Sequence, residues 1–252
     1  MNIEQPLSPR LQKLTQNTLQ QLQNAVRKYG NVAYSNSLGA EAMVLTDIIW
    51  SHVPEIDVFT LDTGRLHEET RGLLERLERR YQKRFQVYYP DATQIENYVR
   101  QNGINGFYLG SEERQSCCGI RKVEPFKRAI EGRAAWVTGV RREQSAERAD
   151  GEAISWDERY SLWKISPLLD WSETEVWEYI RAKNLPYNPL HDQGYPSIGC
   201  EPCTRAVEAG ADPRSGRWWW ESADSRECGL QPRRRVIPIK VEITARRAAS
   251  GG

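Results

Sequence analysis

The chain has 252 residues, a length typical of one domain with at most an appendage. Its 35 Lys and Arg residues against 34 Asp and Glu residues give a net charge of +1, so bulk charge attracts it neither to nucleic acid nor to a membrane. No apolar run approaches the roughly 18 residues that a membrane span needs. The first residues lack the basic and apolar regions of a secretory signal, so we expect a cytoplasmic protein.

Ser8 and Pro9 are typical of a helix start, an N-cap residue followed by proline at the first helical position. Leu11 and Leu22 continue a stripe of apolar residues at helical spacing, and Gly30 suits the end of that helix. We expect this helix to pack against the core and assign it no chemistry.

Residues 31–34 are short and apolar, like a buried strand, and a small polar loop over residues 35–41 precedes an apolar helix. A strand, a loop and a helix start in this order offer backbone N–H groups to an anion. The loop matches neither the G-x-x-x-x-G-K-[ST] nor the G-x-G-x-x-G pattern. Taken alone, such a loop is more often a plain connection.

The same alternation continues along the chain. Further strands are expected at residues 56–61, 85–89 and 134–138, and further helices at residues 68–81 and 123–130. Strands that alternate with helices predict a mainly parallel α/β sheet flanked by helices. Ligands of such sheets bind beyond the carboxyl ends of the strands. One nucleotide could therefore contact residues 35–39, 62–65 and 139–142.

Two local signals mark the last third of the chain. Ser172 and Glu175 have the spacing of a capping box, and Trp171 can pack against Val176 at the same helix start. Residues 231–252 are rich in arginine and then in small polar residues, so we expect a mobile tail there.

The five cysteines form an adjacent pair, Cys117 and Cys118, a C-x-x-C motif, Cys200 and Cys203, and a single Cys228. Adjacent side chains diverge on a helix or a strand, whereas one zinc ion usually takes its ligand pairs from C-x₂₋₄-C. A [4Fe–4S] cluster has four iron atoms at separate corners, and each can bind one cysteine thiolate. The spacing therefore favours a [4Fe–4S] cluster over zinc. The structural alternative is that Cys117 is a buried cysteine that binds no metal.

Cys228 lies near the chain end, where a thiolate can reach a bound ligand and then meet a protein reductant; the alternative is a stray surface cysteine. Basic residues that suit a polyanionic substrate follow the motifs. They are Arg121, Lys122, Arg141, Arg142, Arg214 and Arg217. We interpret His52 and His67 as structural, and leave the role of His191 open.

Seven stretches together carry a family resemblance. They are 37–41 (SLGAE), 61–67 (LDTGRLH), 117–125 (CCGIRKVEP), 138–145 (TGVRREQS), 195–205 (YPSIGCEPCTR), 216–221 (GRWWWE) and 227–230 (ECGL). The joint pattern closely resembles the bacterial assimilatory adenylyl-sulfate (APS) reductases. The resemblance extends over nearly the whole chain, to about residue 231.

The resemblance implies an adenine nucleotide α-hydrolase-like (Rossmann-like) fold, with residues 1–220 as the α/β domain that holds the iron–sulfur site. Residues 221–252 would be a flexible segment that carries Cys228 as the nucleophile. The four other cysteines match the [4Fe–4S] ligands, and Lys122, Arg214 and Arg217 match basic residues around the phosphosulfate. The expected substrate-binding residues are Ser35, Ser37, Gly39, Thr63, Lys122, Gly139, Arg141, Arg142, Arg214 and Arg217.

The implied reaction transfers the sulfonate of APS to Cys228, releasing AMP, and a thioredoxin or glutaredoxin then releases sulfite. The donor is expected as a separate protein, and the enzyme as a homo-oligomer. Two residues depart from the family pattern: Ala42 stands where an Asp is usual, and Gln231 where a His is usual. A phosphoadenylyl-sulfate (PAPS) or dual-specificity reductase, and a non-catalytic iron–sulfur protein that binds nucleotides, are the alternatives.

Overall fold

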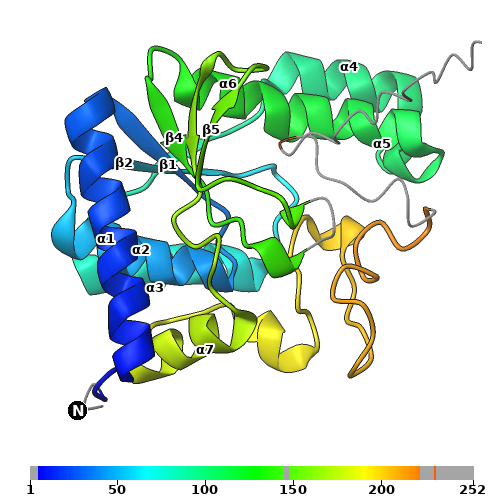
Figure 1. Ribbon diagram of the computed structural model, residues 1–252. Coiled ribbons are helices and arrows are strands. Elements are labelled where there is room, and N and C mark those ends of the chain that lie inside the picture. Colours follow the sequence, from blue (N-terminus) through cyan, green and yellow to red (C-terminus); the bar gives the residue numbers. More distant parts are fainter. Residues whose placement is uncertain (1–4, 145–147, 222–229, 231–252) are drawn as a thin grey trace, which may run out of the picture.

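The computed structural model describes residues 5–144, 148–221 and 230. These residues form a six-stranded sheet in the order β3-β2-β1-β4-β6-β5 (Figure 1). The strands are β1 (Val32–Asn36), β2 (Asp57–Leu61), β3 (Gln86–Tyr88), β4 (Ala135–Val137), β5 (Ile154–Asp157) and β6 (Leu162–Ile165). All neighbouring pairs are parallel except β5 with β6. The expectation of a mainly parallel sheet is confirmed, whereas the β5–β6 hairpin at its edge was not anticipated.

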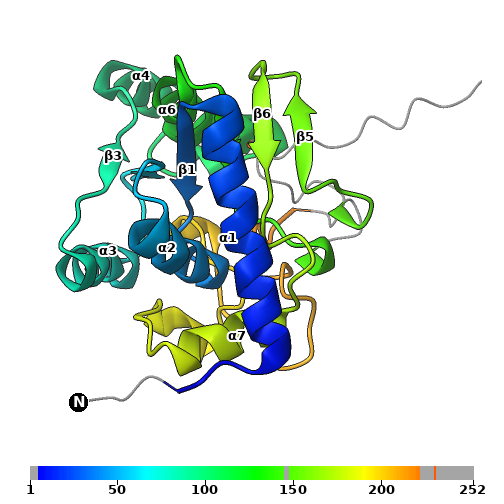
Figure 2. The same cartoon turned by 60° about the vertical axis from the view of Figure 1, so that its left-hand side comes forward.

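Helices cover both faces of the sheet (Figures 1 and 2). They are α1 (Pro9–Tyr29), α2 (Ala40–His52), α3 (Glu68–Tyr81), α4 (Ala92–Asn102), α5 (Ser111–Cys118), α6 (Glu124–Ile130) and α7 (Glu173–Ala182). The larger core lies between one face of the sheet and α1, α2, α3 and α7. A smaller core joins Phe126 of α6 to Phe59 and Trp136 on the other face. No helix in the described ranges is long and apolar enough to cross a membrane.

The sequence signals for α1 and α2 act as expected. The Ser8 side chain accepts a hydrogen bond from the backbone N–H of Leu11, and Gly30, at φ 71°, ends the helix with its N–H on Val26. Helix α2 is apolar on all sides because it is buried; Val44, Leu45 and Ile48 are fully covered. Its first residue follows Gly39, so the start of a rigid, buried helix meets the end of β1.

The helical segment before β4 is longer than the sequence suggested. A helix was expected from residue 123, but the chain is already helical from Ser111, through α5, a wide π-helical turn over Gly119–Val123, and α6. Such wide turns often occur at functional sites. Here the turn follows Cys118 directly, so the adjacent cysteines lie at the end of α5.

After α7 the chain returns to the sheet edge where β1 and β2 end. Leu66 and Cys200 form an isolated antiparallel bridge, and the backbone N–H of Glu201 donates to the carbonyl of Arg65 at 2.8 Å. A second bridge joins Thr204 to Arg217. These pairings bring the C-x-x-C motif next to the turn that follows β2.

Candidate active site

The loop after β1 is shaped by an asparagine. Strand β1 extends to Asn36, so Ser35 belongs to the strand, not to the loop. The Oδ1 atom of Asn36 accepts the N–H of Leu38 at 2.8 Å, and its Nδ2 donates to Thr46 at 2.6 Å. Sequence reasoning passed over Asn36, although Asn two residues before a tight turn is a known turn signal. Ser37 is exposed, and its hydroxyl accepts the N–H of Gly39 at 3.4 Å.

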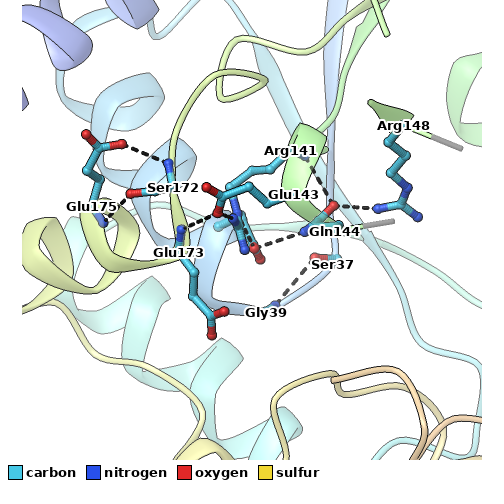
Figure 3. Close-up of polar contacts among 10 residues, drawn as sticks. Ser37, Gly39, Arg141, Glu143, Gln144, Arg148, Ser172, Glu173 and Glu175 are labelled. Carbon is cyan, nitrogen blue, oxygen red and sulfur yellow. Dashed lines mark hydrogen bonds and ion pairs between the residues drawn. The ribbon is translucent and has the colours of Figure 1, made fainter. Parts of the chain in front are cut away.

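Arg141 joins the loop after β4 to the start of α2 (Figure 3). Its Nε donates to Oε1 of Glu41 at 2.8 Å, and its Nη1 donates to Glu143 at 3.1 Å. The amide of Gln144 donates to the same Glu41 oxygen at 2.9 Å. A Cβ at Gly139 would lie 3.1 Å from the Cβ of Glu41, so the two loops approach closely there. The predicted substrate residues Gly139 and Arg141 thus lie beside the first turn of α2.

Arg142 has partners of another kind. Its guanidinium donates to Asp170 at 2.6 Å and to the carbonyls of Ala149 and Gly151 at 2.8 and 2.6 Å. These contacts join Arg142 to Ala149, Gly151 and Asp170. The neighbouring Glu143 accepts the backbone N–H of Glu173 at the start of α7 (Figure 3). Arg142 therefore holds the loop in place, and its contact with a substrate stays a prediction.

The four cysteines expected to bind a metal come together. Cys117 and Cys118 from α5, and Cys200 and Cys203 from the C-x-x-C turn, line one cavity together with Thr63, Lys122 and Arg217. All four are free thiols. The hydroxyl of Thr63 lies 3.2 Å from the sulfur of Cys200. Within the described residues, no three His, Cys, Asp or Glu side chains gather as ligands of a single metal ion do.

Burial and mutual repulsion govern these thiols. Burial raises the pKa of Cys203 to about 12, and the charges of Cys200 and Cys118 add to this effect. Burial also raises the pKa of Cys117, which the charge of Arg121 partly offsets. A positively charged iron centre holds cysteines as thiolates, so four cysteines that line one cavity suit such a centre. The donor set therefore fits a [4Fe–4S] cluster.

Two arginines in this region make structural contacts that the sequence did not indicate. Arg121 is buried and donates to the carbonyl of Thr63 at 2.7 Å. Arg114 makes a two-point ion pair with Glu221, at 2.8 and 2.9 Å. Burial alone lowers the pKa of Arg114, but the hydrogen bonds and charge of Glu221, followed by the charge of Cys118, outweigh it and raise the pKa. The sequence indicated Arg121 as a basic residue suited to a substrate anion, not as a buried support of the turn after β2, and no local motif indicates Arg114.

Arg214 and the two histidines His67 and His191 do not line the cysteine cavity. Arg214 is half-buried, and its backbone N–H donates to Asp212 at 2.8 Å. Burial lowers the pKa of His67, whose ring packs against Tyr195, in keeping with a structural role. Burial also lowers the pKa of His191, which packs against Trp177.

Some expectations fall outside the described residues. Cys228, Gln231 and the tail over residues 231–252 are among them, so the structure does not place the expected nucleophile. Leu230 is described, and its carbonyl accepts a hydrogen bond from Arg159 at 2.6 Å. The division of the chain at residue 220 stays a prediction.

Together, the parallel sheet, the loop at its carboxyl edge and the cysteine-lined cavity define an α/β protein with a thiol-rich site. Comparison with known proteins gives the family. A model of the phosphoadenosine phosphosulfate reductase domain matches residues 31–206. An adenosine 5'-phosphosulfate reductase of Allochromatium vinosum is 53% identical over 212 residues, covering 84% of this chain and 83% of that protein. The corresponding protein of Burkholderia cepacia is 50% identical, with 81% of each chain covered.

Solved structures agree with this assignment. A phosphoadenylyl-sulfate reductase of Candida auris, in a phosphate complex, aligns with a TM-score of 0.64 and 27% identity, covering 81% of this chain and all of that one. An FMN adenylyltransferase of Candida glabrata aligns with a TM-score of 0.56 at 15% identity, over 86% of this chain and 75% of that one, which shows a shared fold alone. The chain belongs to the phosphoadenosine phosphosulfate reductase family and is an oxidoreductase that acts on sulfur. The expected adenine nucleotide α-hydrolase-like fold is confirmed.

Proposed function

We propose that this protein reduces adenylyl sulfate to sulfite and AMP in cytoplasmic sulfate assimilation, through an S-sulfocysteine on Cys228. Thioredoxin or glutaredoxin is the proposed electron donor. The observation that carries the proposal is the convergence of Cys117, Cys118, Cys200 and Cys203 on one cavity with Lys122 and Arg217. The name shared by relatives at 53% and 50% identity supports the choice of substrate.

The proposed chemistry has two steps. The Cys228 thiolate attacks the sulfonyl sulfur; a sulfur–sulfur bond forms, the bond from sulfur to the phosphate oxygen breaks, and its electron pair leaves with AMP. A thiolate of the donor then attacks the Cys228 sulfur, and the electron pair of the sulfur–sulfur bond leaves with sulfite. The second donor thiol resolves the mixed disulfide. The two donor thiols are oxidised to a disulfide, which supplies the two electrons that sulfate sulfur gains.

In this proposal the chain's own groups bind and orient an anion that another anion must attack. Lys122 and Arg217 offset the negative charge of the phosphosulfate and of the departing phosphate. The start of α2 offers a second anion-binding element through the positive end of the helix dipole. The Glu41–Arg141 ion pair keeps that element against the loop after β4. A [4Fe–4S] cluster held by the four cysteines would organise the site and tune its charge without carrying the electrons.

PAPS is the alternative substrate, and one observation favours it: the structural match to a phosphoadenylyl-sulfate reductase at 27% identity. The two substrates differ by a 3′-phosphate. The ratio of kcat/KM for APS and PAPS separates the readings, and we expect the higher value for APS. A clear preference for the 3′-phosphorylated nucleotide would overturn the choice.

Mass spectrometry of anaerobically purified protein mixed with APS, without any thiol, tests the proposed intermediate. We expect the protein to gain one SO₃ group, and Cys228→Ser to abolish the gain. Binding of APS with release of AMP but without an adduct on Cys228 would contradict the mechanism, and binding without either product would favour the non-catalytic alternative. Iron and acid-labile sulfide in equal amounts, with a brown colour, are expected for the cluster; a colourless zinc protein would contradict it.

A further inference from the structure

A buried ion pair joins the helix of the adjacent cysteines to Glu221, which follows the three tryptophans Trp218–Trp220. Arg114 of α5 and Glu221 are 107 residues apart, yet Nε and Nη2 of Arg114 donate to both carboxylate oxygens at 2.8 and 2.9 Å. The two side chains are only 2% and 5% exposed. Two parallel hydrogen bonds fix orientation as well as distance, because the guanidinium and the carboxylate are both planar.

The same guanidinium takes part in a stack around one aromatic ring. The Cζ atom of Arg114 lies 4.7 Å from the centroid of the Trp218 ring, and the Cζ atom of Arg217 lies 4.6 Å from it. Trp218 is buried at φ 44°, a conformation that a bulky residue adopts only when its surroundings fix it. Its N–H donates to the carbonyl of Cys203 at 3.1 Å. The stack therefore spans from the C-x-x-C turn to α5.

Hydrogen bonds hold both guanidiniums of this group. Glu221 accepts two from Arg114, and Nη1 of Arg217 donates to the hydroxyl of Ser197 and the carbonyl of Ile198, both at 3.4 Å. Removal of the Glu221 charge would leave two cations over one ring, where they repel each other. A buried ion pair is often no more stabilising than an apolar pair of the same volume, so stability alone does not require it here.

We propose that Arg114 and Glu221 are positioning residues that fix Trp218 and thereby hold the Arg217 guanidinium at the cysteine-lined cavity, ready to bind the outer anionic group of the substrate. The assignment of that anion rests on the proposed function. Arg114 itself lines the cysteine cavity and hydrogen-bonds Cys118. The proposed effect of the pair on Arg217 passes through Trp218. Loss of the Arg114–Glu221 pair would misplace the Arg217 guanidinium. One charged hydrogen-bond donor changes the affinity for an anionic ligand about tenfold to a hundredfold.

ADP is the probe, because its β-phosphate presents an anion where APS carries its sulfonate, and its binding needs neither Cys228 nor turnover. Isothermal titration calorimetry of the cluster-loaded Glu221→Gln protein should show ADP affinity about tenfold or more below that of the wild type. The exposed pair Arg79–Glu75, at 2.7 Å with both side chains 72% exposed, supplies the control. Glu75→Gln should bind ADP as the wild type does.

A double variant, Arg114→Met with Glu221→Leu, separates positioning from stability. Because its apolar side chains have a similar size, the double variant should have the melting temperature of the wild type. Its ADP affinity should stay as weak as that of Glu221→Gln. If the double variant recovers both, or if Glu221→Gln binds ADP like the wild type, the pair is only structural and the proposal is wrong. A wild type that binds ADP but makes no sulfite from APS would instead overturn the proposed function and leave this inference standing.

Discussion

Alanine at position 199 should displace the Arg217 guanidinium and leave the fold intact. A Cβ at Gly199 would lie 2.2 Å from Nη2 and 2.5 Å from Cζ of Arg217. Ordinary carbon contacts need about 3.5 Å, so the end of the arginine must move by roughly 1 Å or more. Because that end belongs to a long flexible side chain, movement costs less than unfolding.

The expected loss follows from the displacement. A misplacement of about 1 Å in a positioned group can lower activity on the order of a hundredfold. We therefore expect Gly199→Ala to weaken ADP binding, and to lower kcat/KM for APS, by about ten- to a hundredfold. The melting temperature should stay within about 2 °C, because less than 1 kcal/mol of folding free energy is at stake.

Two other glycines give matched controls. A Cβ at Gly216 would meet the backbone carbonyl of Arg205 at 2.3 Å and Val207 at 2.9 Å, so Gly216→Ala must move backbone and should lower the melting temperature. Gly72 faces solvent in α3 with nothing within 4 Å of its Cβ position. Gly72→Ala should leave ADP binding unchanged and stabilise the helix by about 0.5–1 kcal/mol.

Calorimetry of ADP binding and thermal unfolding of the three variants measure the two effects separately. Wild-type ADP affinity in Gly199→Ala would refute the role of Arg217 in anion binding. A fall in melting temperature equal to that of Gly216→Ala would show that the substitution damages the fold instead.

Two further predictions concern stability. Asp47 accepts hydrogen bonds from the hydroxyls of Tyr81 and Tyr179 at 2.6 and 2.7 Å. Asp47→Ala should therefore lower the free energy of unfolding, measured in urea, by about 1–3 kcal/mol for each hydroxyl that loses its acceptor. An unchanged midpoint of the urea unfolding curve would contradict this. Burial alone raises the pKa of Glu175, but hydrogen bonds from Ser172 and Arg10 outweigh it and lower the pKa. The carboxylate therefore stabilises the fold fully above its unfolded pKa of about 4.3, and this contribution is lost as the pH falls through the lower folded pKa. The gap in unfolding free energy between wild type and Glu175→Gln should shrink below about pH 4, and a constant gap from pH 7 to pH 3 would count against the reasoning.

The sequence by itself determined the features that depend on neighbours within a few residues. The Ser8 cap and the capping box of Ser172 and Glu175 form as expected, because each joins a side chain to a backbone N–H three residues away. The alternation of strands and helices likewise predicted a parallel sheet with its loops at one edge. The spacing of the cysteines indicated which four belong together, since an adjacent pair and C-x-x-C are local patterns.

Only the tertiary structure decided which distant groups meet. Glu41 and Arg141 are 100 residues apart, and Arg114 and Glu221 are 107 apart, so no local spacing could join either pair. The β5–β6 hairpin owes its place to the parallel pairing of β6 with β4. Each of these contacts gains its strength from burial by the whole fold, because a charge pair or a strand edge exposed to water stabilises little.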